Sequence, residues 1–269
     1  MIIININKLL KTKIFILIII IVGCSHKDQI DISFIPTLDG IPFDCSTITS
    51  DIRLTDLRFY IHNIRLIEAS GSSTPVLLEN RGEWQQNNLA LIDLDNNEGN
   101  CINGTPGFNQ KIIGKYKRGD YKNLEFTIGV PFHLNHIDPF KAPNILSYSD
   151  MHWHWNSGYK FFRLGVITNN NDGFFLHLGS SGCIGTIGNI TKCNYPNRPT
   201  INIPNFTSNN KIYIDIRKLL QGTNLKDQYI ENCQSAPNDI DCEIPFDSLG
   251  INQDISNNIK DTQDLFYLD

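Results

Sequence analysis

The sequence has none of the short motifs that mark nucleotide-binding enzymes or zinc-thiolate sites. It contains no P-loop, no glycine-rich dinucleotide fingerprint and no Cys-x-x-Cys pair among its seven cysteines. The segment GSSG (residues 179–182) falls short of the hydrolase nucleophile elbow, because Cys183 stands where the motif needs its second glycine. No acidic pair of the kind used by glycoside hydrolases stands out. The absence of these motifs argues against the enzyme classes that they mark.

An excess of positive charge is also missing. The chain has 28 acidic and 23 basic side chains, a formal net charge of −5. Three lysines lie in the first 23 residues, so the remainder has 20 basic against 28 acidic groups, a net charge of −8. Nucleic-acid-binding proteins normally show the opposite balance. We therefore expect no nucleic-acid partner.

The amino terminus has the features of an export signal. Three lysines precede an apolar run at residues 14–22, which is shorter than the roughly 20 residues of a membrane-spanning helix. A small residue before Cys24 resembles a bacterial lipobox. This predicts a lipoprotein signal peptide (residues 1–23), a lipidated Cys24 and a polar tether (residues 24–29). A plain signal peptide and an uncleaved anchor are the alternatives, and all three place the remainder outside the cytoplasm.

Six cysteines remain once Cys24 is set aside, and an even number in an oxidising compartment implies disulfides. Proximity favours two short loops and leaves one long link. The expected pairs are Cys183–Cys193, Cys233–Cys242 and Cys45–Cys101. A thiolate metal site is the alternative, but the lack of a Cys-x-x-Cys pair argues against it.

Short apolar segments separated by turn residues run through the rest of the chain. Residues 30–36 alternate apolar and polar side chains, and residues 51–68 favour one or two strands, although helical spacing partly fits them. Residues 159–167 and 173–178 are expected to pair as a hairpin. The pattern predicts an all-β fold, an antiparallel β-sandwich or barrel with long disulfide-bearing loops. One domain is expected over residues 30–269.

Two further segments complete the predicted organisation. The loop at residues 93–107 is dense in Asp, Asn and Gly, but Glu98 stands where an EF-hand calcium loop requires glycine. We therefore interpret it as a turn-rich loop rather than a calcium site. The end of the domain is expected to contain a cysteine-bearing loop and a short helix within residues 247–268.

The stretch MHWHWNSGYKFFR (residues 151–163) contains two of the three tryptophans, two of the seven histidines and one of the two methionines. In an extended strand, His152 and His154 would share one face, and Met151, Trp153 and Trp155 the other. Two imidazoles spaced in this way can serve as metal ligands. An ordinary half-buried aromatic strand is the alternative interpretation.

Histidines also gather around this stretch. Four of them, at positions 133, 136, 152 and 154, lie within 22 residues. Imidazole donors without free thiolates, in an exported protein, fit copper well. The distribution therefore indicates a metal site, with copper as the favoured ion.

Three motifs together resemble a known family. FYIHNIRL (59–66), M-x-W-x-W-N-S-G-Y-K-F-x-R (151–163) and HLGSSGC (177–183), with Cys193 and Asn197-Arg198, resemble the MbnP-like family over about residues 30 to 220. These are bacterial periplasmic or surface copper-binding proteins, often encoded beside a MauG-like di-haem enzyme. The resemblance implies a β-sandwich that binds copper. It also implies that the di-haem partner oxidises a tryptophan near the copper to kynurenine.

Carried onto this chain, the resemblance makes Trp153 and Trp155 the candidates for oxidation, with Met151 and Tyr159 as supporting residues. His177 matches the histidine before the Gly-Ser-Ser-Gly-Cys turn. The predicted copper ligands are His177, His154, His152 and His62, of which His152 and His154 rest on spacing, because other residue types are common there in the family.

The predicted function is therefore that of a copper-binding lipoprotein of the cell envelope, facing the periplasm or the cell surface. It would acquire, store or deliver copper, and would be a substrate of its di-haem partner and a carrier rather than a catalyst. An extracellular copper oxidoreductase and a non-catalytic surface adhesion or structural lipoprotein are the alternatives.

Overall fold

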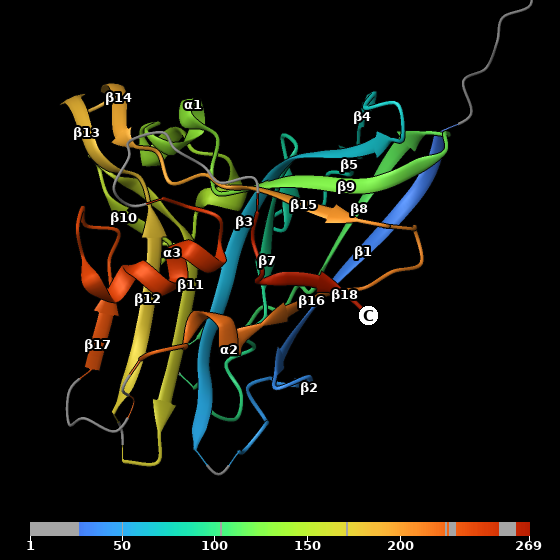
Figure 1. Ribbon diagram of the computed structural model, residues 1–269. Helices are drawn as coiled ribbons and strands as arrows, with labels where there is room; N and C mark the ends of the chain where they lie inside the picture. Colours follow the sequence, from blue (N-terminus) through green and yellow to red (C-terminus); the bar gives the residue numbers. More distant parts are fainter. Residues whose placement is uncertain are drawn as a thin grey trace, which may run out of the picture.

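The computed structural model describes residues 27–49, 51–102, 104–170, 172–223, 225, 230–252 and 262–269. Within these residues the strands form a large sheet, a smaller sheet and a separate hairpin (Figure 1). The predicted signal peptide and Cys24 lie outside the described residues, as does the segment 253–261 of the predicted C-terminal helix. Among the helices that are described, none has the length and apolar character needed to cross a membrane.

The smaller sheet has the strand order β18-β16-β1-β8-β5, with β2 beside β1, and the large sheet has the order β15-β9-β3-β11-β12-β17, with β10, β4, β7 and β6 at its margins. The strands are β1 (Lys27–Leu38), β2 (Ile41–Pro42), β3 (Ile52–Glu68), β4 (Ser73–Pro75), β5 (Leu77–Leu78), β6 (Gln85–Gln86), β7 (Leu89–Asp93), β8 (Lys111–Lys117), β9 (Tyr121–Ile128), β10 (His152–His154), β11 (Gly158–Thr168), β12 (Gly173–Gly179), β13 (Ser181–Thr186), β14 (Asn189–Tyr195), β15 (Thr200–Pro204), β16 (Ile212–Asp215), β17 (Ile230–Cys233) and β18 (Phe266–Leu268).

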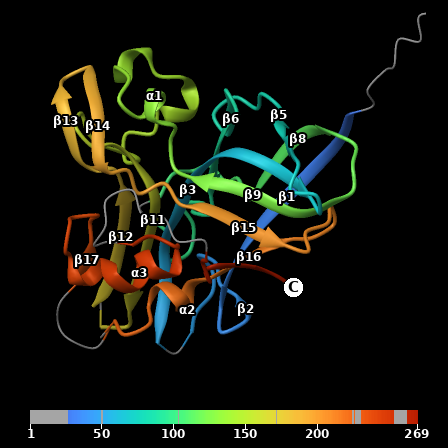
Figure 2. The ribbon, with the colours of Figure 1, turned by 45° about the horizontal axis from the view of Figure 1, so that its top comes forward.

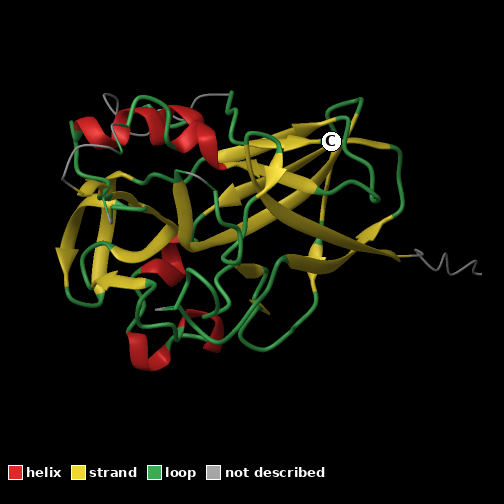
Figure 3. Ribbon diagram, turned by 90° about the horizontal axis from the view of Figure 1, so that it is seen from below, coloured by secondary structure: helices red, strands yellow, loops and turns green. Residues whose placement is uncertain are grey.

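Short helices lie at the periphery of the strand layers, and Figure 3 shows them on two opposite sides. They are α1 (Phe132–Asn135), α2 (Ile216–Leu219) and α3 (Glu243–Ser248), with 3-10 turns η1 (Pro139–Lys141), η2 (Asn144–Leu146) and η3 (Ile240–Cys242). The predicted helix within 247–268 is thus wrong in its extent, because α3 ends at Ser248 and residues 266–268 form strand β18.

Aromatic side chains from both sheets fill the space between them. Phe34 of β1 packs edge-on against Phe59 of β3 and Phe126 of β9, with ring centroids 5.5 and 5.8 Å apart. Phe266 of β18 contacts Phe126 at 5.4 Å from the same side. Burying these rings contributes to the hydrophobic stabilisation of the domain. The predicted all-β sandwich is confirmed, and the barrel alternative is not adopted.

Strand β3 is the longest element, and one irregularity divides it. Its first half pairs with β11 and its second half with β9, and the register shifts between His62 and Arg65. Asn63 has a φ of 51°, which asparagine tolerates better than most residues. This β-bulge bends the strand from one partner to the next. The prediction of one or two strands at residues 51–68 is confirmed as one bent strand.

One strand boundary and one whole strand differ from the sequence-based expectation. Strand β1 begins at Lys27, so residues 27–29 of the predicted tether already belong to the sheet. Strand β8 was not among the strands expected from the sequence. A Cβ at Gly114 would lie 2.6 Å from the side chain of Val76, so the glycine allows the neighbouring chain to approach closely.

A buried ion-pair cluster ties β3 and β11 to the turn before β10. Arg58, only 1% exposed, donates two hydrogen bonds to Asp56 (2.9 and 2.8 Å) and pairs with Asp150. Arg163 pairs with the same two carboxylates, at 2.6 Å from Asp56 and 3.0 Å from Asp150. Burial alone would lower the pKa of Arg58, but the hydrogen bonds to Asp56 and the charge of Asp150 raise it above its usual range. The cluster fixes the start of the stretch 151–163 against the large sheet.

The three predicted disulfides are confirmed: Cys45–Cys101, Cys183–Cys193 and Cys233–Cys242. The second bridges β13 and β14, in which the two cysteines are direct cross-strand neighbours. Figure 2 shows this hairpin at the same end of the molecule as α1. That end of the sandwich contains the candidate site.

Candidate metal centre

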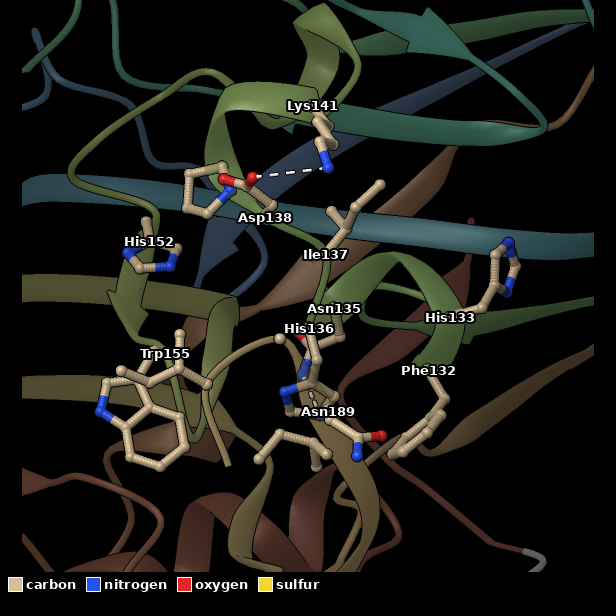
Figure 4. Close-up of a pocket in the computed structure, with 14 residues that line it drawn as sticks. Phe132, His133, Asn135, His136, Ile137, Asp138, Lys141, His152, Trp155 and Asn189 are labelled. Carbon is tan, nitrogen blue, oxygen red and sulfur yellow. Dashed lines mark hydrogen bonds and ion pairs between the residues drawn. The ribbon is translucent and has the colours of Figure 1, made fainter. Parts of the chain in front are cut away.

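A cavity of about 660 Å³ opens between α1, β10 and the β13–β14 hairpin. The chain reaches it from three segments that are far apart in the sequence: the loop after β9, the aromatic stretch, and the tip of the hairpin. Its walls combine imidazoles, aromatic rings and a few polar groups (Figure 4). The lining residues are Phe132, His133, Asn135, His136, Ile137, Asp138, Pro139, Lys141, His152, Trp155, Ile187, Gly188, Asn189 and Ile190.

Three imidazoles and one indole share this cavity. His152 and Trp155 lie on one side of the cavity in Figure 4, His136 lies in the middle, and His133, a residue of α1, lies at the opposite side. Trp155 is 38% exposed. Strand β10 ends at His154, so the alternation of faces stops before Trp155. The sequence prediction that Trp155 faces away from His152 is therefore wrong, because both line the same space.

Asn135 sets the orientation and tautomer of His136. The Asn135 side-chain oxygen accepts a hydrogen bond from the backbone N–H of Tyr159 at 2.9 Å. Its amide nitrogen therefore donates, to the carbonyl of Ser157 at 2.9 Å and to Nε2 of His136 at 3.1 Å. Nε2 is thereby assigned as the unprotonated nitrogen, and its lone pair, which accepts this hydrogen bond, becomes available to a metal ion only when Asn135 releases it.

Gly158 makes this arrangement possible. It has a φ of +81°, and a Cβ at this position would lie 2.4 Å from the amide nitrogen of Asn135. Any other residue would be strained and would displace Asn135. The glycine of the N-S-G-Y motif thus serves the histidine in the neighbouring loop.

Two of the cavity imidazoles are neutral at physiological pH. Burial lowers the pKa of His136 to about 4, and the charge of Arg198 acts in the same direction. The pKa of His152 is also lowered, by burial first and then by the charges of His154 and Lys160. Neutral imidazoles can ligate a metal without first losing a proton.

Trp153 lies against a different part of the molecule. Its indole packs over Gly179, where a Cβ would lie 3.0 Å from the ring, and its centroid is 6.2 Å from that of His177. Ser235 holds this strand end in place, accepting a hydrogen bond from the N–H of Gly179 and donating one to the carbonyl of His177, both at 3.0 Å. The aromatic stretch therefore packs against the HLGSSGC motif through the contact of Trp153 with Gly179.

The remaining motif residues anchor the loops around the cavity. Asn197 donates a hydrogen bond to the carbonyl of Gly179 at 2.8 Å. Arg198 donates to the carbonyl of Val130 at 2.6 Å and lies 4.6 Å from the ring centre of Phe161. Burial lowers the pKa of Arg198 to about 10. The hydrogen bond to Val130 fixes the chain just before α1, and the one to Gly179 fixes the end of β12. Met151 and Tyr159, predicted as supporting residues, are buried in the core.

The four predicted ligands lie in four different surroundings. His152 lines the cavity, His154 is exposed beside Trp155 at a centroid distance of 5.4 Å, and His177 lies beyond the cavity next to Trp153. His62 lies on β3, with Nδ1 2.9 Å from the carbonyl of Gly129. Their roles as ligands stay predictions.

The ligand atoms of the cavity histidines do not converge on one point. In the part of the chain that the structure describes, three or more His, Cys, Asp or Glu ligand atoms lie within 4.8 Å of one another in two places, and each includes a disulfide. In the sequence, His133 and His136 were noted as part of the histidine cluster but were not predicted as ligands. Their i, i+3 spacing, which places two side chains on one face of a helical turn, could have indicated that they lie close together.

The environment of His62 leads to a pH-dependent stability. Burial lowers the pKa of His62 from 6.5 to about 4 in the folded protein. Between these values the unfolded chain binds a proton that the folded chain does not, so stability is lost as the pH falls through this window. Replacing His62→Gln removes the titration. From about pH 7 to about pH 5, the original protein should lose about 1–2 kcal/mol more unfolding free energy than the variant. Urea unfolding at both pH values measures this, and equal losses would contradict it.

Comparison with known proteins agrees with the sequence motifs. The MbnP family matches residues 27–235, most of the chain. The fold is similar to that of MbnP from Methylosinus trichosporium, with a TM-score of 0.79 and 24% identity over 90% of this chain and 98% of that chain. No curated protein sequence gives a significant match. The extent of the family match, on a sandwich whose motif residues converge at one end, identifies the chain as a member of the MbnP family.

Proposed function

We propose that this chain is an exported copper-binding protein, with His136 and His152 as ligands and Trp155 as the residue that a di-haem partner oxidises to kynurenine. The observation that supports this proposal is the shared cavity: two neutral imidazoles and a partly exposed indole line one space. Copper itself is the ion implied by the resemblance of the motifs.

The donor set fits copper. Imidazole nitrogen suits copper, zinc, iron and nickel, whereas the six cysteines of the described domain are bound in disulfides and offer no thiolate. Asp138 is 4.0 Å from Lys141, which leaves this carboxylate partly neutralised. When bound, copper would supply a redox-active cation. The protein holds the ring of His136 in place through Asn135, and aromatic and aliphatic side chains form part of the cavity wall.

Oxidation of Trp155 would add the donor that the cavity lacks. The reaction breaks the C2–C3 bond of the indole and converts both carbons to carbonyl groups, with oxygen and oxidising equivalents from the haem enzyme and its peroxide-class oxidant. Hydrolysis then releases the formyl group as formate. The product carries an aryl amine and a ketone, which are a nitrogen and an oxygen donor facing His136 and His152.

Trp155 is favoured over Trp153 on grounds of access. Trp155 is 38% exposed on the cavity wall, whereas Trp153 is half-buried against Gly179. Trp84, outside any recognised motif, stacks on Tyr148 at a centroid distance of 6.0 Å and lines no part of the cavity. An external haem enzyme would therefore reach Trp155 most directly.

The proposed location is the cell envelope, with a lipid on Cys24 as the anchor. Because β1 begins at Lys27, two residues would separate the lipidated cysteine from the first strand. The copper cavity would then belong to a domain held close to a membrane surface. This placement suits acquisition, storage or delivery of copper outside the cytoplasm.

Peptide mass spectrometry after co-expression with a MauG-like di-haem enzyme tests the proposal. We expect the loss of one carbon and the gain of one oxygen at Trp155. The Trp155→Phe variant should lack this change, and the Trp153→Phe variant should retain it. Modification confined to Trp153 would overturn the assignment. An unmodified, copper-free protein would overturn the proposed function.

A further inference from the structure

One of the three disulfides differs from the others in its surroundings. The four cysteines of Cys45–Cys101 and Cys233–Cys242 are no more than 3% exposed. Cys183, in contrast, is half-buried. It lies on the β13–β14 hairpin, which pairs with neither the large nor the smaller sheet. A thiolate from solution can therefore reach this disulfide without opening the core of the sandwich.

A histidine contacts the same disulfide. Nε2 of His136 lies 3.5 Å from Sγ of Cys193, and a ligand atom from each of His136, Cys183 and Cys193 lies within 4.8 Å of the other two. The second cluster of this kind, Asp95 with Cys45–Cys101, is buried and contains no imidazole. His136 thus links an accessible disulfide to the cavity.

We infer that the Cys183–Cys193 disulfide is a redox switch. Its reduction by a dithiol would create, together with His136, a site for Cu(I) with two thiolate ligands and one imidazole ligand. The site shares His136 with the proposed copper cavity but needs neither His152 nor Trp155. The inference therefore deepens the proposed function, while its metal binding can be tested separately.

The exchange is balanced as two thiolate attacks. The first thiolate of the dithiol attacks Sγ of Cys183, the more exposed of the two residues, and the S–S bond breaks with the electron pair on Cys193. The second thiolate then attacks the mixed disulfide, which releases Cys183 and leaves the reductant as its own disulfide. Two electrons have passed to the cysteines. The two protons of the dithiol reside on the cysteines until a metal displaces them.

The hairpin keeps the released thiols together. Backbone pairs flank the cysteines on both sides, Ser181 with Tyr195 and Ile184 with Lys192. Asn156 donates a hydrogen bond to the carbonyl of Cys183 at 3.0 Å, which ties this strand to the aromatic stretch. The two sulfurs therefore remain on the face of the hairpin that is turned toward His136 after the S–S bond is broken.

Ligand softness determines the choice of metal. Two thiolates and one imidazole form a soft donor set that selects Cu(I), in contrast to the nitrogen donors of the oxidised cavity. To ligate, Nε2 of His136 exchanges its hydrogen bond from Asn135 for the metal. Asn135 keeps its hydrogen bonds to Ser157 and Tyr159, so the loop is not released.

Anaerobic competition for Cu(I) with a colorimetric chelator tests this inference, using the purified protein in oxidised form and after treatment with a dithiol that is then removed. Alkylation and peptide mapping establish which cysteines are free. We expect Cys183 and Cys193 to be alkylated first. The reduced protein should bind Cu(I) at least about 100-fold more tightly than the oxidised protein and show a thiolate-to-copper absorption band.

Variants separate this inference from the proposed function. The gain on reduction should vanish in Cys183→Ser/Cys193→Ser and in His136→Ala. It should persist in His133→Ala, the matched control on the same helical turn, and in His152→Ala/Trp155→Phe, which lacks the proposed oxidised site. An unchanged affinity when both thiols are free would overturn the inference, as would a gain that survives in the double serine variant. Failure of the oxidised protein alone to bind copper would count against the proposed function only.

Discussion

Replacing Arg58→Met is expected to lower the free energy of unfolding by about 3–5 kcal/mol, the usual cost of removing one partner from a buried ion-pair network. The guanidinium is 1% exposed and neutralises Asp56 and Asp150, with Asp95 at 3.8 Å. Arg163 would remain as the cation paired with the carboxylates of Asp56 and Asp150. Since small domains have only about 5–15 kcal/mol of stability, this loss would be a large share of the total.

Chemical denaturation measures this effect, and the chain offers a matched control. Arg217 makes a similar two-point contact with Asp39, at 2.9 and 2.6 Å, but both side chains are well exposed, at 39% and 60%. Arg217→Met should therefore cost no more than about 1 kcal/mol. If the two substitutions proved equally mild, the Arg58 cluster would not anchor the stretch 151–163 as described.

The second large effect concerns copper. Replacing His136→Ala and His152→Ala together should weaken copper binding by more than about 100-fold, because the loss of an outer-shell partner alone typically costs 10–100-fold. Both imidazoles line the cavity with lowered pKa values, and the carboxylate of Asp138 in the same lining lies 4.0 Å from the ammonium group of Lys141. Isothermal titration or chelator competition with the oxidised protein measures the change.

The matched control for this experiment is His154→Ala/His177→Ala. His154 is exposed and His177 lies next to Trp153, and neither lines the cavity. The double variant should keep copper affinity within about threefold, well under the cost of losing even an outer-shell partner. If it lost affinity while the His136/His152 variant did not, the sequence-based ligand set would be favoured over the cavity.

Local patterns predicted much of the fold because they act over short distances. The β11–β12 hairpin follows from two apolar runs around a polar turn, and two of the disulfides close loops of 9 and 10 residues. Strand β8 was missed since its glycine is explained by the close approach of Val76 and Leu77, which belong to a distant segment of the chain. The parallel pairings of β1 with β16 and β12 with β17 also join distant segments, which no local pattern encodes.

The candidate site was less predictable for the same reason. Alternation correctly marked residues 152–154 as extended, but it could not show that the strand ends there and turns Trp155 back toward His152. His136 gains its role from Asn135, from Gly158 and from the hairpin disulfide, all of which are tertiary contacts. The motif residues pointed to the right end of the molecule, whereas the ligand geometry required the fold.

The most direct measurement of the central proposal is an anomalous difference map from crystals of the oxidised protein loaded with copper. We predict one copper peak in the cavity, about 2 Å from nitrogen atoms of His136 and His152 and adjacent to residue 155. A copper ion bound instead to His154 and His177, or a fully copper-loaded crystal without a peak in the cavity, would contradict it.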